Sequence, residues 1–235
     1  MEMKFRIFRF DADVDKEPHY QEYLVSAEPG ERILDCLNRI RWEQDGTLSY
    51  RMSCAHGVCG SDGMKINGVC ALACQKLVKE YPNGEVTLEP LPFFKVLKDL
   101  TVDMNTFLAG IMYVRPWLIT LSAPPEKERM QSPEEAKKVA EAIRCILCAC
   151  CTGACPVMRD NPNYLGPATL VWAFRHVFDS RDEEQTERLK QIDVPDGVWS
   201  CVNYFECTRV CPKNIPVTKG INTLKQEIKK ALQQQ

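Results

Sequence analysis

Cysteine stands out in this sequence, because 13 of the 235 residues are cysteines and they are clustered. One run, CILCACCTGACP, places Cys145, Cys148, Cys151 and Cys155 at the spacing C-x2-C-x2-C-x3-C, with Pro156 directly after it. This spacing is typical of loops that hold [4Fe–4S] clusters. Three thiolates from one short loop reach three irons of a compact cubane, and the fourth ligand comes from another part of the chain.

A second run, CVNYFECTRVCP, repeats this spacing with one change. Cys201, Cys207 and Cys211 stand at cysteine positions, and Tyr204 stands where the remaining cysteine belongs. In ferredoxins with two clusters, the fourth cysteine of each run ligates the cluster of the other run. The two runs therefore predict two clusters, one with four thiolate ligands and one with three.

The crossing rule assigns each of these cysteines to one cluster. We expect a [4Fe–4S] cluster on Cys145, Cys148, Cys151 and Cys211, and a second cluster on Cys155, Cys201 and Cys207. Because Tyr204 supplies no thiolate, the fourth corner of the second cluster loses its iron easily, and we expect [3Fe–4S] there. Two alternatives stay open: a [4Fe–4S] cluster with one open iron for a substrate, as in a hydro-lyase, and a zinc-binding array.

The first half of the chain carries a third pattern, in the stretch SCAHGVCGSDGMKINGVCALAC. Plant-type [2Fe–2S] sites use the spacing C-x4-C-x2-C followed by a distant cysteine. Cys54, Cys59 and Cys74 fit this pattern, and Asp62 stands at its third position. A carboxylate oxygen can ligate iron. We prefer Asp62 as the fourth ligand, with Cys70 as the alternative, because Asp62 holds the motif position.

The predicted secondary structure around these loops changes from strands in the first half of the chain to helices in the second. Alternating and β-branched residues predict strands in the first half, around one helix whose apolar residues recur at helical spacing. Beyond a segment rich in proline and charge, which we interpret as an inter-domain linker or an exposed connection, the sequence is helical. The strands are expected at 4–10, 20–27, 64–69 (a hairpin on Asn67-Gly68) and 85–91, the helices at 31–44, 133–144, 166–180 and 218–233, and the connection at 122–135.

Composition excludes several classes of protein. A net charge of -2 makes nucleic acid a poor partner, and no apolar run is long enough to cross a membrane. The N-terminal stretch MEMKFRIFRF has no apolar core of the kind found in secretory signals. The clustered cysteines in a chain of this length favour metal or redox use over a disulfide framework.

The order of these motifs resembles the iron–sulfur subunit of succinate dehydrogenase and fumarate reductase. The supporting stretches are RMSCAHGVCGSDGMKING, LKDLTVDM, RCILCACC, NPNYLGPA, DSRD and VCPKNIP, and the resemblance covers essentially the whole chain. It implies an α+β fold. A plant-type, β-grasp-like ferredoxin domain is expected over residues 1–105, followed by an all-α domain similar to bacterial ferredoxins over residues 106–235.

The resemblance also implies a function. In this family the subunit relays electrons from a partner subunit that carries FAD, through [2Fe–2S], [4Fe–4S] and [3Fe–4S] clusters, to quinone at membrane-anchor subunits. We expect a peripheral protein on the cytoplasmic face of the inner membrane, with haem b possible in the anchor. The quinone is expected in the vicinity of Pro156, Arg159 and Asp160.

Two departures leave the direction of the reaction open. Succinate dehydrogenases often have a tryptophan shortly after the first Cys-Pro and a histidine after the next cysteine, where this chain has no tryptophan and Val202. We prefer succinate oxidation, with fumarate reduction as the alternative. A free-standing ferredoxin and the iron–sulfur subunit of another dehydrogenase, such as a glycolate or glycerol-3-phosphate enzyme, are the remaining alternatives.

Overall fold

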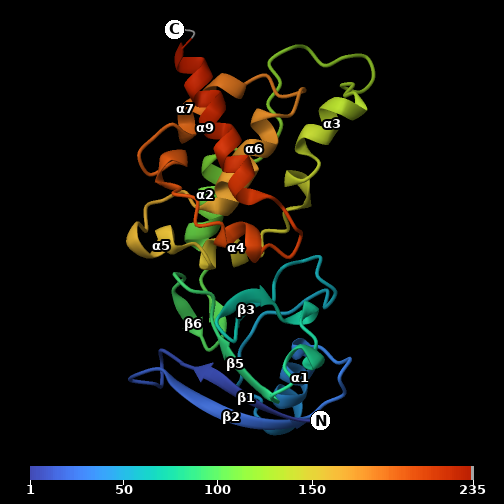
Figure 1. Cartoon of the computed structure of the whole chain (residues 1–235), viewed down its shortest axis with the longest axis vertical. Coiled ribbons are helices and arrows are strands. Elements are labelled where there is room, and N and C mark those ends of the chain that lie inside the picture. Colours follow the sequence, from blue (N-terminus) through green and yellow to red (C-terminus); the bar gives the residue numbers. More distant parts are fainter. Residues whose placement is uncertain (234–235) are drawn as a thin grey trace. The chain divides into compact units, whose positions relative to one another are not determined.

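A five-stranded mixed sheet with the order β2-β1-β5-β3-β4 is the framework of the N-terminal half in this computed structural model, which describes residues 1–233 (Figure 1). β1 pairs with β5 in parallel, and the other pairs in the sheet are antiparallel. A separate two-stranded sheet joins β6 and β7. The strands are β1 (Glu2–Arg9), β2 (His19–Ser26), β3 (Gly63–Ile66), β4 (Val69–Leu72), β5 (Glu85–Glu89), β6 (Val96–Lys98) and β7 (Thr101–Val102).

The chain divides into two units, which are described separately. The first holds residues 1–104 and 146–154, and the second holds residues 105–145 and the chain from Cys155 onward. The short segment 146–154 thus belongs to the unit that carries the sheet. No helix among the described residues is long and apolar enough to span a membrane.

The core of the first unit is formed in part by apolar residues that alternate with polar residues along the strands. In β1, Met3, Phe5 and Ile7 are fully buried while the residues between them are more exposed. α1 (Ile33–Arg39) buries Ile33, Leu34, Cys36 and Leu37 on one side. Burial also raises the pKa of the Cys36 thiol to about 11, so this cysteine is a core side chain rather than a nucleophile. The helix expected over 31–44 is correct in place, but its last turn, Ile40–Gln44, is a π-helix.

A buried arginine fixes the chain that leads into the first cysteine loop. The guanidinium of Arg9 donates to Asp99 Oδ1 over 2.9 Å and to Thr47 Oγ1 over 2.8 Å. The other oxygen of Asp99 accepts the N–H of Ser49 over 2.8 Å. Residues 47–49 are therefore tied to the sheet a few positions before Cys54, which limits the freedom of the loop that follows.

The second unit is helical and is organised around α6 (Pro167–Val177), whose residues are buried on most sides and which packs against α7 and α9 (Figure 1). The sequence prediction of helices here is confirmed, although α3 is shorter than expected and is followed by a separate 3-10 turn. The other helices of this unit are α2 (Asn105–Tyr113), α3 (Pro133–Val139), α5 (Pro156–Asp160), α7 (Gln185–Ile192), α8 (Glu206–Arg209) and α9 (Val217–Gln233), while α4 (Cys150–Gly153) belongs to the first unit. The 3-10 turns are η2 (Ala73–Gln75), η3 (Val78–Glu80), η4 (Ala142–Arg144) and η5 (Val198–Ser200).

The proline-rich segment before α3 is an exposed connection inside the second unit, so the reading of it as a link between two units is wrong. It ends where Ser132 caps α3. The hydroxyl of Ser132 accepts the N–H of Glu135, and the Glu135 carboxylate accepts the N–H of Ser132 over 2.8 Å. This reciprocal capping box explains why the helix begins directly after Ser132.

Candidate iron–sulfur cluster sites

The loop that begins at Cys54 surrounds its own sulfur atoms with backbone N–H groups. The N–H groups of Val58 and Cys59 lie 3.4 and 3.2 Å from Cys54 Sγ, and the N–H of Cys54 lies 3.4 Å from Cys59 Sγ. Hydrogen bonds from the backbone, that of His56 first, lower the pKa of Cys54 to about 6. Such a thiol is already a thiolate near neutral pH, which is the form that binds iron.

Asp62 and Cys74 meet on the buried side of the same loop. Both are almost fully buried, and Asp62 Oδ2 accepts the N–H of Cys74 over 2.6 Å. Burial, and then the Asp62 carboxylate, raise the pKa of Cys74 to about 12. A carboxylate oxygen and a sulfur atom held together in a buried site are donors that a metal cation can bridge, so this donor set fits iron.

The alternative ligand Cys70 is placed differently. A Cβ added to Gly153 would lie 3.4 Å from Cys70 Sγ, so this sulfur lies against α4. The structure therefore brings Asp62 against Cys74, while the Cys70 sulfur lies against α4. This arrangement agrees with the preference drawn from the motif position.

The two cysteine runs of the C-terminal half have the same backbone conformation. In the first, Leu147 and Ala149 have φ angles of 56° and 61°, and in the second, Asn203 and Phe205 both have 64°. These residues occupy equivalent positions, and each pair is followed by a four-residue helix, α4 or α8. Left-handed φ angles outside glycine are costly and cluster at functional sites. The spacing repeat in the sequence is thus a structural repeat, in which Tyr204 takes the place of Cys148.

Three of the predicted ligands share one cavity in the second unit. Cys155, Cys201 and Cys207 line one small pocket, together with Tyr204 and Pro156. The lining offers three sulfur donors, and at the fourth position it offers a phenol from a side chain that is 55% exposed. This donor set fits a cluster with three protein ligands.

Arg159 and Asp160 do not line this cavity. Their side chains form an ion pair with each other over 2.8 Å, and both are mostly exposed. Of the three residues expected near quinone, only Pro156 is among those that line the cavity of the three cysteines.

The four cysteines expected to hold the [4Fe–4S] cluster are divided between the units. Cys148 and Cys151 belong to the first, and Cys145 and Cys211 belong to the second. Within the first unit, Cys148 lines the same cavity of about 490 Å³ as Cys59 and Asp62. A hydrogen bond from the Cys150 thiol lowers the pKa of Cys148 and raises that of Cys150. Cys150 is therefore a donor to a predicted ligand, a role that its position between ligands did not reveal.

Sequence reasoning also missed two hydroxyl groups. Tyr164 and Thr218 both line the cavity of the three cysteines, and both are buried. They follow the two cysteine runs but lie outside the motif spacing, so spacing alone gives no sign of them.

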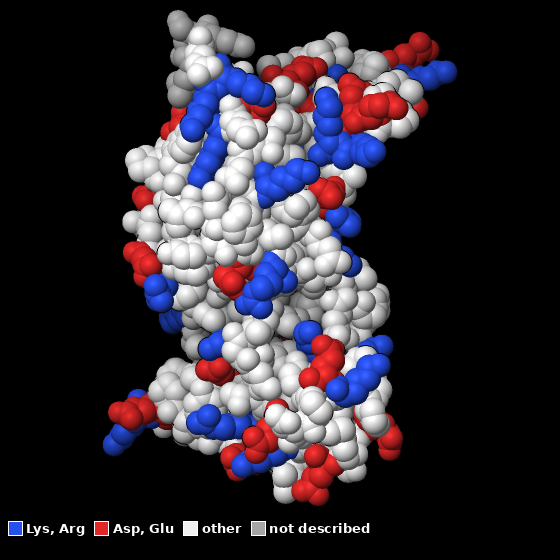
Figure 2. Space-filling model, viewed as in Figure 1, with Lys and Arg blue, Asp and Glu red and all other residues white. Residues whose placement is uncertain are grey.

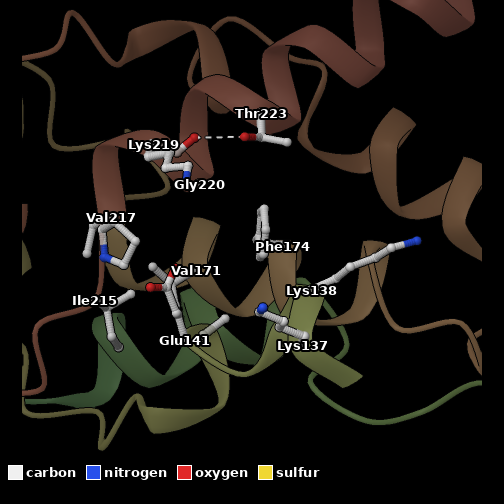
Figure 3. A pocket seen from close by; sticks show the side chains of 12 residues that line it. Lys137, Lys138, Glu141, Val171, Phe174, Ile215, Val217, Lys219, Gly220 and Thr223 are labelled. Carbon is white, nitrogen blue, oxygen red and sulfur yellow. Dashed lines mark hydrogen bonds between the residues drawn. The ribbon is translucent and has the colours of Figure 1, made fainter. Parts of the chain in front are cut away.

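A larger pocket of about 670 Å³ lies elsewhere in the second unit, among α3, α6 and α9 (Figure 3). Its floor includes Val171 and Phe174, and lysines of α3 and α9 line it. Figure 2 shows Lys and Arg side chains over the visible faces of these two helices. The lining contains no cysteine, so this pocket takes no part in the predicted cluster sites.

Comparisons with known proteins show the family to which this chain belongs. Residues 4–109 match the family model of the 2Fe-2S iron-sulfur cluster binding domain, and residues 141–215 match that of the 4Fe-4S dicluster domain. The succinate dehydrogenase iron-sulfur subunit of Coxiella burnetii is 43% identical over 229 residues, which cover 96% of this chain and 97% of that one. This chain belongs to the family of succinate dehydrogenase and fumarate reductase iron–sulfur subunits.

Other proteins similar to this iron–sulfur subunit include a fumarate reductase subunit and a chain of an Sdh1 complex. The fumarate reductase iron-sulfur subunit of Mycobacterium tuberculosis is 37% identical over 221 residues, covering 93% of this chain and 90% of that one. A chain of the Mycobacterium smegmatis Sdh1 complex in the apo form superposes with a TM-score of 0.84 at 27% identity, covering 98% of this chain and 96% of that one. The expected fold class, a [2Fe–2S] ferredoxin domain followed by a helical ferredoxin domain, is confirmed.

Proposed function

We propose that this subunit relays electrons from a flavoprotein subunit that carries FAD to quinone at a membrane anchor, in a succinate dehydrogenase. Its clusters would pass electrons one at a time, in the order [2Fe–2S], [4Fe–4S], [3Fe–4S]. The observation that carries this proposal is the repeated cysteine loop in which Tyr204 replaces a ligand, beside a cavity lined by three cysteines. Such a repeat suits a relay of clusters with different potentials.

The proposed ligand sets follow the sequence pattern. Asp62 is included because it lies against Cys74, and the three-iron set is included because its cysteines share a cavity. We assign the [4Fe–4S] set from the crossing rule for two-cluster ferredoxins alone. The sets are Cys54, Cys59, Asp62 and Cys74 for [2Fe–2S]; Cys145, Cys148, Cys151 and Cys211 for [4Fe–4S]; and Cys155, Cys201 and Cys207 for [3Fe–4S].

Exposed apolar side chains at two of the proposed cluster sites indicate surfaces that bind partner subunits. Val202, Tyr204 and Phe205 are between 55% and 62% exposed at the cavity of the three cysteines, and Val58 is 55% exposed beside Cys59. Apolar groups exposed next to a functional site are typical of interaction surfaces. We assign the surface at Val58 to the flavoprotein subunit and the surface at Tyr204 to the anchor.

The quinone would be reduced close to the three-iron site. Pro156 lines that cavity, and Arg159 and Asp160 follow it on α5 as an exposed ion pair. We place the subunit on the cytoplasmic face of the inner membrane, held there by anchor subunits that contain haem b in some family members. Succinate oxidation is preferred because the 43% identical relative bears that name, and fumarate reduction is the alternative.

The test of this function is reduction by substrate. We expect the complex purified from membranes through this subunit to contain a flavoprotein, and succinate alone to reduce the [3Fe–4S] signal seen by low-temperature EPR. Faster turnover with quinol and fumarate than with succinate and quinone would favour the fumarate reductase alternative. Purification of the chain without partners, or clusters reduced by dithionite but never by succinate, would refute the proposal and favour a ferredoxin or another dehydrogenase.

Tyr204→Cys tests the identity of the third cluster. Because Tyr204 occupies the position of Cys148 in a loop of the same conformation, a cysteine there should supply the missing thiolate. We expect the oxidised [3Fe–4S] EPR signal to disappear, iron content to rise by one atom per chain, and the cluster potential to fall. Tyr204→Phe is the matched control and should keep the three-iron signal. An unchanged signal in Tyr204→Cys would contradict the assignment of this corner.

A further inference from the structure

The cavity of the three cysteines has a mostly apolar wall interrupted by a few polar side chains. Pro156, Val157, Pro167 and Ile221 contribute apolar surface. Two of the polar side chains, Tyr164 and Thr218, are 3% and 0% exposed. A hydroxyl group buried to this extent acts on a neighbouring sulfur atom with little screening by water.

The neighbours of Thr218 decide which group donates in the hydrogen bond between Thr218 and Cys207. Thr218 Oγ1 lies 3.4 Å from Cys207 Sγ and 3.1 Å from Thr208 Oγ1. Thr208 Oγ1 also accepts the N–H of Thr218 over 3.0 Å. A cysteine that ligates iron has no proton, so Thr218 must be the donor to Cys207 and is free to accept from Thr208. The two threonines therefore form a short chain of hydroxyls that ends on a predicted ligand.

Tyr164 presents a buried hydroxyl group to the sulfur atoms that line the cavity. Its oxygen is buried without a nitrogen or oxygen partner, although the ring lines the cavity. The side chains that act on it are those of Cys201, Cys155 and Cys207, and the Cys201 sulfur is within hydrogen-bond reach of the hydroxyl. A buried phenol without an acceptor is unfavourable, so its donor needs an acceptor in the cavity. The sulfur atoms of a bound cluster and its ligands are acceptors of this kind.

We propose that Tyr164 and Thr218 donate hydrogen bonds to the sulfur atoms of the three-iron site and thereby hold its reduction potential high. This inference rests on the proposed function, since it requires the [3Fe–4S] cluster. Reduction adds an electron and makes the sulfur atoms more negative, so a donor stabilises the reduced form more than the oxidised form. Hydrogen bonds to sulfur are among the factors that set cluster potentials. Both residues are positioning residues for electron transfer to quinone.

The experiment is a redox titration of the intact complex, followed by the EPR signal of oxidised [3Fe–4S]. We expect Thr218→Val and Tyr164→Phe each to reduce the equilibrium constant for reduction about three- to tenfold, a fall in potential of about 28 to 59 mV for one electron. Thr218→Ser keeps a hydroxyl and should restore the potential of the natural protein. The double variant should lower the potential further than either single variant, because each hydroxyl donates its own hydrogen bond.

Two control variants remove hydroxyls outside the cavity. Thr223 lies on the same helix as Thr218, but its hydroxyl donates to the carbonyl of Lys219 over 3.0 Å at the other pocket (Figure 3). The hydroxyl of Tyr113 donates to the carbonyl of Gln191 over 3.0 Å. Thr223→Val and Tyr113→Phe should leave the potential unchanged.

The outcomes separate this inference from the proposed function. A natural protein without any three-iron signal would refute the cluster assignment, and this inference with it. A normal signal whose potential is unchanged in both Thr218→Val and Tyr164→Phe would overturn this inference alone. If Thr218→Val fails to hold its cluster, Tyr164→Phe decides: a lowered potential supports the role of the hydroxyls, and an unchanged one overturns it.

Discussion

Gly60→Ala is expected to disrupt two cluster sites at once. Gly60 lies between Cys59 and Asp62 with a φ angle of +70°. A Cβ at this position would lie 2.8 Å from Cys148 Cβ and 2.9 Å from the carbonyl oxygen of Ile146, both in the same unit. Atoms do not approach so closely, so one of the two loops must move. Because each loop carries predicted iron ligands, we expect losses of [2Fe–2S] and [4Fe–4S] content together.

The expected cost combines two effects. A left-handed φ angle at alanine costs about 1 kcal/mol, and an overpacked contact costs about 1–3 kcal/mol more. The measurements are thermal unfolding and quantitative EPR of the reduced protein. Gly68→Ala is the matched control, because Gly68 has a φ angle of +84° but nothing within 4 Å of the added carbon. It should lose about 1 kcal/mol of stability and keep both clusters.

Equal effects of the two glycine variants would contradict this account. They would mean that backbone strain alone, and not the contact with Cys148, sets the cost. The contact has a functional meaning as well. It places the loop of the proposed two-iron site directly against Cys148, a proposed ligand of the four-iron site.

The parts of the site that sequence alone predicts are those governed by local spacing. The repeat with Tyr204 at a cysteine position could be recognised because a short loop fixes which side chains reach a cluster. The position of Asp62 followed from the same logic. In contrast, the contact between Cys74 and Asp62 depends on how η2 lies against the turn before β3. The position of the Cys70 sulfur beside Gly153 depends on how β4 and α4 pack.

Packing between distant segments explains what sequence reasoning missed. The motif spacing does not show that the absence of a side chain at Gly60 makes room for Ile146 and Cys148. Tyr164 and Thr218 reach the three-iron cavity from two other segments of the chain. Apolar periodicity predicted a helix over 31–44, but it does not distinguish an α-turn from the π-turn at Ile40–Gln44.

Arg188→Met is expected to cause the largest loss of stability in the helical unit. Arg188, on α7, is 1% exposed and donates to both carboxylate oxygens of Asp182, over 3.0 and 2.8 Å. Its remaining donors reach three backbone carbonyls of the segment after α2, those of Val114, Arg115 and Trp117, over 2.9, 2.8 and 2.7 Å. All five N–H groups of the guanidinium are therefore used.

The loss follows from what the variant leaves behind. Without the guanidinium, the Asp182 carboxylate is buried without its counter-charge, and three carbonyls lose a donor. Burial alone would raise the pKa of Asp182, but the hydrogen bonds from Arg188 and from the backbone keep it below its usual value. Breaking a buried pair by removing one partner typically costs about 3–5 kcal/mol. We expect a loss of this size in chemical denaturation followed by circular dichroism.

Two further variants show whether the cost comes from the stranded carboxylate. Arg159→Met breaks an exposed ion pair and should cost no more than about 1 kcal/mol. Arg188→Met combined with Asp182→Leu removes both buried charges, so it should recover part of the loss seen in Arg188→Met alone. The three carbonyls would still lack their donor, so recovery should be incomplete. A double variant as unstable as the sum of its single variants would show instead that Arg188 acts mainly by holding residues 114–117 in place.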